Sequence, residues 1–196
     1  MEKEFFGRIY KKHLTKLKNI EIPHKKLVVC FSAVPGSGKT HIARILEKRY
    51  KAVRINNDDI RKIIKVLVKK NKNLAKEDRQ TLLLEYLLYL IKNFSFANKL
   101  IILDSSIDRK YKMLIPVLKK NDFRFFVIRL GVSTNVLKKR ISFRAKKAPK
   151  HFKEKSEDWF KDYEDCRKSL RADIIIKNEG WTDLSNLFSI LDRIIK

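Results

Sequence analysis

Short apolar runs alternate along the chain with longer segments whose apolar residues recur at helical spacing. The apolar runs predict strands, at 27–31, 52–55, 99–104, 123–130 and 173–176. The amphipathic segments predict helices, from about 42 onward, at 60–67, 77–97 and 109–120, after 133–135, and at 182–195. Strands that alternate with helices are typical of an α/β fold, in which a parallel sheet is covered by helices on both faces.

The first part of the chain forms a separate amphipathic pattern. In residues 2–20 apolar side chains recur at helical spacing with lysines opposite them, and Pro23 ends the pattern. Such a basic helix packs on its own domain or lies on a membrane surface or a nucleic acid. No linker rich in Gly, Pro or Ser follows, so we expect this N-terminal helix (1–24) to pack on or extend a single domain (25–196).

Net charge is the most unusual feature of the composition. The 196 residues include 47 Lys and Arg against 22 Asp and Glu, which gives a formal net charge of +25. A surface of this kind attracts polyanions, including nucleic acids. A general lysine bias of the composition explains the charge equally well, so a nucleic-acid partner is one of two open interpretations.

The cysteines and the apolar content of the sequence indicate the cellular compartment of the protein. The two cysteines, Cys30 and Cys166, show neither a disulfide framework nor a zinc motif, which fits a reducing interior. The most apolar run, 82–91, is shorter than the roughly 20 residues of a membrane span and contains Glu85. With an N-terminus unlike a secretory signal, these features predict a soluble, cytoplasmic protein without a membrane span.

A glycine-containing loop between the first strand and its helix carries the strongest chemical signal. It ends in Gly-Lys-Thr, as a P-loop does, and its backbone N–H groups would cradle phosphates. Lys39 would reach the outer phosphates and the Thr40 hydroxyl a magnesium ion. The residues expected to bind the nucleotide are Val34, Pro35, Gly36, Ser37, Gly38, Lys39, Thr40 and His41. One departure is Ala33, which stands where P-loops usually begin with glycine.

Acidic residues follow two of the predicted strands. Asp104 ends the apolar run 99–104, which is the Walker B pattern of a residue near the magnesium, and Asp58 and Asp59 follow the run 52–55. Ligands of parallel α/β sheets bind beyond the carboxyl ends of the strands. We therefore expect these acidic residues to meet Lys39 and Thr40 at one edge of the sheet.

Four stretches together resemble the P-loop kinases of the polynucleotide kinase and zeta-toxin group, which carry an AAA-type ATP-binding domain. They are Val34–Thr40, Asn56–Arg61, Ile101–Ser106, and the pair Arg140 and Arg144, so the resemblance covers about residues 27–145. It implies a nucleoside-kinase-like three-layer sandwich with strand order 2-3-1-4-5 and a lid at about 133–155.

The resemblance also implies a role for each candidate residue. Asp58 would be the catalytic base, Arg61 with Asp59 would bind the acceptor, and Thr40 with Asp104 would hold magnesium. The expected catalytic residues are Asp58, Lys39, Arg140 and Arg144, the two arginines acting from the lid. Simpler roles stay open, since either aspartate could only cap a helix and the arginines could form an ordinary basic face.

These roles describe an ATP- and Mg²⁺-dependent enzyme that transfers a phosphoryl group to a hydroxyl, for which we favour a nucleic-acid 5′-hydroxyl end. A zeta-toxin-like kinase of a nucleotide sugar or other small molecule is the alternative within the enzyme class. A nucleic-acid-associated regulatory ATPase is an alternative of another class, and a nucleotide-binding protein without activity is a third, suggested by Ala33 alone. The preference for ATP over GTP rests on the resemblance, and no residue indicates an antitoxin-like partner.

Overall fold

The computed structural model describes residues 26–70, 79–95, 100–108, 110–120, 122–145 and 170–196. The predicted N-terminal helix, Cys166 and the part of the predicted lid beyond 145 lie outside the described residues.

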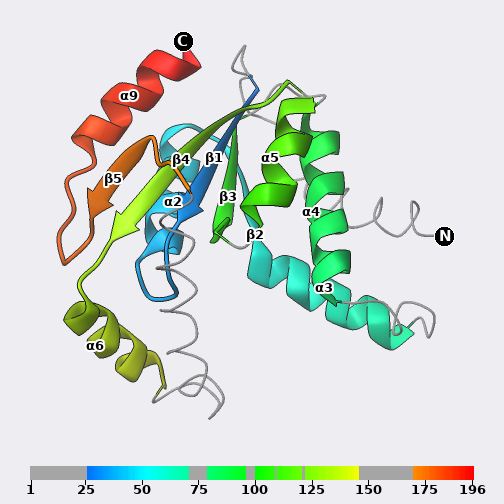
Figure 1. The fold of residues 1–196 in the computed structure, drawn as a ribbon, viewed down its shortest axis with the longest axis horizontal. Coiled ribbons are helices and arrows are strands. Elements are labelled where there is room, and N and C mark those ends of the chain that lie inside the picture. The colour runs from blue at the N-terminus through cyan, green and yellow to red at the C-terminus, as the bar shows by residue number, and fades with distance from the viewer. Residues whose placement is uncertain (1–25, 71–78, 96–99, 109, 121, 146–169) are drawn as a thin grey trace.

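Five parallel strands form the centre of the molecule (Figure 1). They are β1 (Leu27–Ser32), β2 (Val53–Asn56), β3 (Ile101–Ser106), β4 (Arg124–Gly131) and β5 (Ile174–Lys177). The strand order is β2-β3-β1-β4-β5, and every neighbouring pair is parallel. The predicted fold class and the predicted strand order are therefore confirmed.

Six described helices accompany the sheet: α2 (Lys39–Arg49), α3 (Asn57–Lys70), α4 (Arg79–Ser95), α5 (Tyr111–Lys120), α6 (Thr134–Ala145) and α9 (Ser185–Ile195). The helix α3 begins three residues before the predicted start at 60 and α2 three residues before 42, because the first turn of each is polar. Apolar periodicity marks only the buried part of a helix and misses such polar first turns.

Alternating side chains of each strand pack into two separate apolar layers. Val28 and Cys30 of β1 face the layer covered by α3, α4 and α5. Val29 and Phe31 face the opposite layer, covered by α2 and α9. Because both faces of the sheet are covered, the strands read as continuous apolar runs, which is why the sequence predicted them well.

Polar contacts fix α9 against α2 in the second layer. The Tyr50 hydroxyl donates to Asp192 Oδ1 at 2.7 Å, and Arg49 Nη2 donates to Asp192 Oδ2 at 2.9 Å. The Arg49 guanidinium also lies 4.4 Å above the centre of the Phe188 ring. In the described part of the chain, no helix is long and apolar enough to cross a membrane.

Burial makes Cys30 a packing residue. It is fully buried, and burial raises the pKa of its thiol far above the ordinary value. In a Cys166→Ser variant, which leaves Cys30 alone, we expect no reaction with a disulfide reagent such as Ellman's reagent until the protein unfolds. Thiol release followed along a urea titration tests this, and rapid labelling of the folded variant would contradict it.

Candidate active site

The loop between β1 and α2 has the shape of a phosphate cradle. Gly36 and Gly38 adopt positive φ, 88° and 96°, a region that residues with a Cβ rarely occupy. The backbone N–H groups of His41 and Ile42 both donate to the Gly38 carbonyl, at 3.0 and 3.2 Å, so α2 begins directly from the loop. His41 is itself exposed in the first turn of α2. The start of α2 therefore adds the positive end of a helix dipole to the loop.

Lys39 extends back over the beginning of the loop. Its Nζ donates to the carbonyls of Ala33 and Val34, at 3.1 and 2.7 Å. This places the positive charge at the mouth of the cradle, where the outer phosphates of a nucleotide would lie.

Ala33 fits the loop without strain. It does not have a positive φ, and it is 1% exposed and packs in the apolar layer under α2. Its backbone N–H donates to Asp108 Oδ2 at 3.1 Å, and the Ser106 hydroxyl donates to the same oxygen at 2.5 Å. The methyl group that departs from the P-loop pattern therefore occupies apolar space.

A buried amide fixes the opposite side of the loop. Asn178, directly after β5, donates from Nδ2 to the Ser37 carbonyl at 2.6 Å, and its Oδ1 accepts from the Thr182 hydroxyl at 2.7 Å. A Cβ added to Gly38 would lie only 2.2 Å from Asn178 Nδ2. Gly38 is therefore required both by its φ and by the approach of Asn178.

Helix α6 packs directly on the loop. Side chains of Leu137 and Ile141 lie within van der Waals distance of the space beside Gly36. Arg140 Nη1 donates to the Gly36 carbonyl at 3.4 Å, so one of the two predicted lid arginines reaches the loop. Arg144 belongs to α6, but its side chain lies outside those that the structure describes.

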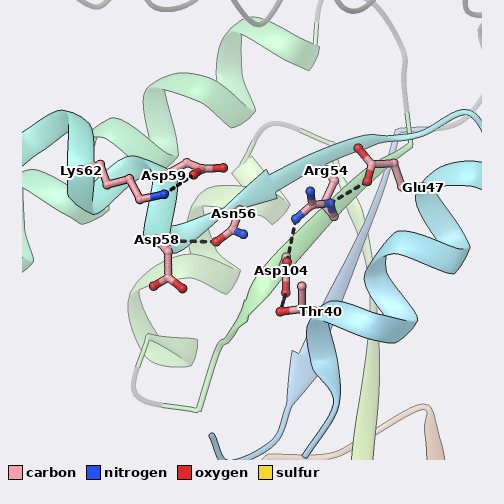
Figure 2. A network of polar contacts seen from close by, with 8 residues as sticks. All are labelled: Thr40, Glu47, Arg54, Asn56, Asp58, Asp59, Lys62 and Asp104. Carbon is pink, nitrogen blue, oxygen red and sulfur yellow. Dashed lines mark hydrogen bonds and ion pairs between the residues drawn. The ribbon is translucent and has the colours of Figure 1, made fainter. Parts of the chain in front are cut away.

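Asp104 lies at the centre of a line of polar contacts (Figure 2). Its Oδ1 accepts from the Thr40 hydroxyl at 3.0 Å, and its Oδ2 accepts from Arg54 Nη1 at 2.8 Å. Arg54 Nε in turn donates to Glu47 Oε2 at 2.6 Å. The register between β1 and β3 is irregular here, since Val29 pairs with Ile102 but Phe31 pairs with Ser106. Such irregularities re-aim side chains next to sites.

In this line of contacts the buried carboxylate of Asp104 is paired with the charged guanidinium of Arg54. The side chain of Asp104 is only 1% exposed and that of Arg54 17%. Burial lowers the pKa of Arg54, but its bonds to Glu47 and Asp104 outweigh burial, and the pKa is raised above the ordinary value. The arginine therefore stays charged and compensates the buried carboxylate.

The Thr40–Asp104 pair fits a magnesium ion. A hydroxyl oxygen and a carboxylate oxygen, in hydrogen-bond contact, are the hard ligands that Mg²⁺ takes from protein. Among the described residues no group of three or more His, Cys, Asp or Glu gathers to hold a metal. A pair of protein ligands agrees with a magnesium ion that takes its other ligands from water and phosphate.

The acidic residues of α3 point in different directions (Figure 2). Asn56 pairs in register with Asp104, so α3 begins beside the Asp104 site. Asp58 is exposed and lies 3.6 Å from Arg61 Nη1, whereas Asp59 lies 3.4 Å from Lys62 Nζ. The start of the helix is capped by Asn56, whose Oδ1 accepts from the Asp58 backbone N–H at 2.8 Å. Neither aspartate is therefore needed as the cap.

Sequence reasoning missed three residues that shape the site: Arg54, Asp108 and Asn178. Each had a signal in the pattern. Arg54 is a charged residue inside a short apolar strand, and Asp108 and Asn178 closely follow strands β3 and β5, at the edge where ligands bind.

The family of the chain follows from a sequence comparison. Residues 28–165 match the family model described as an AAA domain. The match spans well over half of the chain. The protein belongs to this AAA domain family. No curated protein sequence matches the chain.

Solved structures share the fold of this AAA domain protein at low sequence identity. The PezAT toxin–antitoxin system of Streptococcus pneumoniae matches with a TM-score of 0.59 and 13% identity, covering 90% of this chain and 78% of that one. Shikimate kinase from Bacteroides thetaiotaomicron matches with a TM-score of 0.56 and 15% identity, covering 85% of this chain and 98% of that one. The Mycobacterium tuberculosis APS kinase CysC, in complex with AMPPNP and APS, matches with a TM-score of 0.54 and 14% identity, covering 89% of this chain and 100% of that one. These likenesses establish a fold shared with P-loop kinases.

Removal of Arg54 should lower the free energy of unfolding, because the buried Asp104 carboxylate loses its charge partner. Arg54→Met leaves Asp104 without its cation, and breaking a buried pair in this way costs about 3–5 kcal/mol of unfolding free energy. Urea unfolding at neutral pH measures the loss. Glu47→Gln is the matched control, because the Glu47 side chain is 40% exposed and an exposed pair contributes about 1 kcal/mol or less. Equal losses in both variants would contradict this assignment.

Restoring the usual glycine at position 33 should not improve the loop. Ala33→Gly removes a buried methyl and loosens the unfolded chain, so we expect a loss of about 1–2 kcal/mol and no gain in nucleotide affinity. Urea unfolding and calorimetric titration with an ATP analogue measure the two effects. Ala52→Gly, a buried alanine away from the loop, is the control. Tighter nucleotide binding by Ala33→Gly alone would show that the alanine strains the loop.

Proposed function

We propose that this protein is an ATP- and Mg²⁺-dependent kinase that transfers the γ-phosphoryl group of ATP to a hydroxyl acceptor. The observation that carries the proposal is the Thr40–Asp104 hydrogen bond at the end of a phosphate-binding loop, beside the start of α3. The loop supplies a place for the donor, and α3 supplies a carboxylate and a guanidinium beside it. A nucleotide switch without an acceptor does not need the second part.

Different residues carry out the different steps of phosphoryl transfer in this proposal. The loop amides and Lys39 hold the phosphates, and Thr40 with Asp104 would hold the Mg²⁺, which neutralises charge on the phosphates when bound. Asp58 accepts the proton of the acceptor hydroxyl as its oxygen forms a bond to the γ-phosphorus and the bond to ADP breaks. Arg140, joined by Arg144, meets the charge on the transferred group, for which arginine contributes about 10³–10⁵ in rate in related systems.

The acceptor is a separate part of the proposal. A nucleic-acid 5′-hydroxyl end is favoured by the net charge of +25. A small molecule is favoured by the shared fold with a shikimate kinase and an APS kinase, and the resemblance to zeta toxins suggests a nucleotide sugar. Either acceptor would place its hydroxyl at Asp58 and a neighbouring anionic group at Arg61.

Asp58→Asn tests the transfer step. With γ-labelled ATP we screen 5′-hydroxyl oligonucleotides, nucleotides and nucleotide sugars, and measure the label on each acceptor. General base catalysis is worth about 10²–10⁴ in rate, so the variant should lose transfer by that factor while its ATP affinity stays unchanged. Glu85→Gln, an exposed carboxylate of α4, should keep wild-type transfer.

The same screen separates the competing functions. Transfer that survives in Asp58→Asn would show that Asp58 is not the base. Steady ATP hydrolysis that no acceptor accelerates would favour a regulatory ATPase over a kinase.

A further inference from the structure

Lys110 occupies a fixed position at the edge of the sheet where the site lies. It comes directly before α5, and its backbone N–H donates to the Ile107 carbonyl at 2.8 Å. Its own carbonyl accepts from the N–H groups of Met113 and Leu114, at 3.1 and 2.8 Å. The side chain therefore starts from a backbone position held by hydrogen bonds, between α5 and β3, the strand of Asp104.

The Lys110 side chain reaches the start of α3. Its Nζ donates to Asn57 Oδ1 at 3.4 Å, and Asn57 is adjacent to Asp58 in the chain. The first turns of α3 also carry Arg61, which is 3.6 Å from Asp58. Arg61 follows Asn57 by four residues, so the two side chains lie on the same face of α3, one turn apart. The Lys110 amine therefore reaches the face of α3 that carries Arg61.

The positive charges of Lys110 and Arg61 are poorly compensated by the carboxylates around them. Within the described residues no carboxylate lies within 4.0 Å of the Lys110 amine. Burial, and then the nearby charge of Arg61, lower the pKa of Lys110 to about 8. Arg61 has one described carboxylate partner, Asp58, whose Oδ1 lies 3.6 Å from Arg61 Nη1. An anion bound between the cations would relieve their repulsion.

A structural role alone explains Lys110 poorly. Its described contact is a long hydrogen bond to an amide oxygen, which does not offset the cost of removing an ammonium group from water. An apolar side chain at the same position would pack at a lower cost. Desolvated cations that lie next to a candidate site often bind ligands.

We propose that Lys110 and Arg61 together bind a phosphate group of the acceptor, beside the hydroxyl that Asp58 deprotonates. This inference rests on the proposed kinase function. It adds Lys110 as a second residue for the anionic group already placed at Arg61, and it identifies that group as a phosphate near the acceptor hydroxyl. Arg61 supplies a fork of N–H donors, and Lys110 supplies a point charge. Nucleotides and nucleic-acid ends share this chemistry.

The reactivity of the Lys110 amine tests the site without any transfer. The donor loop is filled with Mg²⁺ and a non-hydrolysable ATP analogue, and acetylation of individual lysines at pH 8 is followed by peptide mass spectrometry. Inorganic phosphate is the probe. A bound phosphate keeps Lys110 protonated and covered, so we expect saturable protection of this amine. The exposed Lys112, two residues later on α5, should show none.

A matched pair of variants links the protection to Arg61. Arg61→Gln should raise the phosphate concentration needed for half protection by about tenfold, the usual scale of one lost charge-assisted hydrogen bond. Lys62→Gln, the exposed neighbour, should leave it unchanged. Protection that is absent in the wild type, equal at Lys112, or unaffected by Arg61→Gln would overturn the site.

Further arms identify the source of the phosphate. Protection by a mononucleotide as strong as that by an oligonucleotide supports a small acceptor. Stronger protection by the oligonucleotide that falls steeply with salt supports a nucleic-acid end. The outcome is also distinguishable from the kinase test: protection without transfer to any acceptor leaves the anion site and removes the proposed function. Transfer without protection removes the anion site and leaves the proposed kinase function.

Discussion

The buried carboxylate of Asp104 is the constraint around which the site is built. An ionised group with 1% exposure is tolerated in a protein interior only when opposite charge and hydrogen bonds compensate it. Thr40 supplies the hydrogen bond from α2, and Arg54 supplies the charge from β2. Because the carboxylate needs both partners, it ties the first turn of α2 to the edge of the sheet.

The phosphate loop shows the same dependence on distant partners. Asn178 after β5, Asp108 after β3 and Arg140 of α6 each hydrogen-bond a different backbone group of the loop. These contacts set the loop geometry, and the glycines supply the positive φ values that it requires. An alanine is accommodated at position 33 because its N–H is bonded to Asp108 and its methyl lies in apolar space.

The two halves of the candidate site differ in their physical character. The proposed donor half is built from a buried carboxylate and from backbone groups that are hydrogen-bonded on several sides. The proposed acceptor half, at the start of α3, carries the exposed Asp58–Arg61 pair, and Lys110, directly before α5, reaches the neighbouring Asn57.

The sequence by itself determined the strands of the sheet and the phosphate loop, because buried parallel strands and glycines before Lys39 leave local signals. The strand order was implied by the resemblance to P-loop kinases. The sequence also selected Asp104, Arg140 and the start of α3, which the structure brings to one edge. Only the tertiary structure decided that Arg54 compensates Asp104 and that Lys110 reaches Asn57 at the start of α3. Those contacts join residues of different elements, and a pairing between distant residues leaves no periodic pattern along the chain.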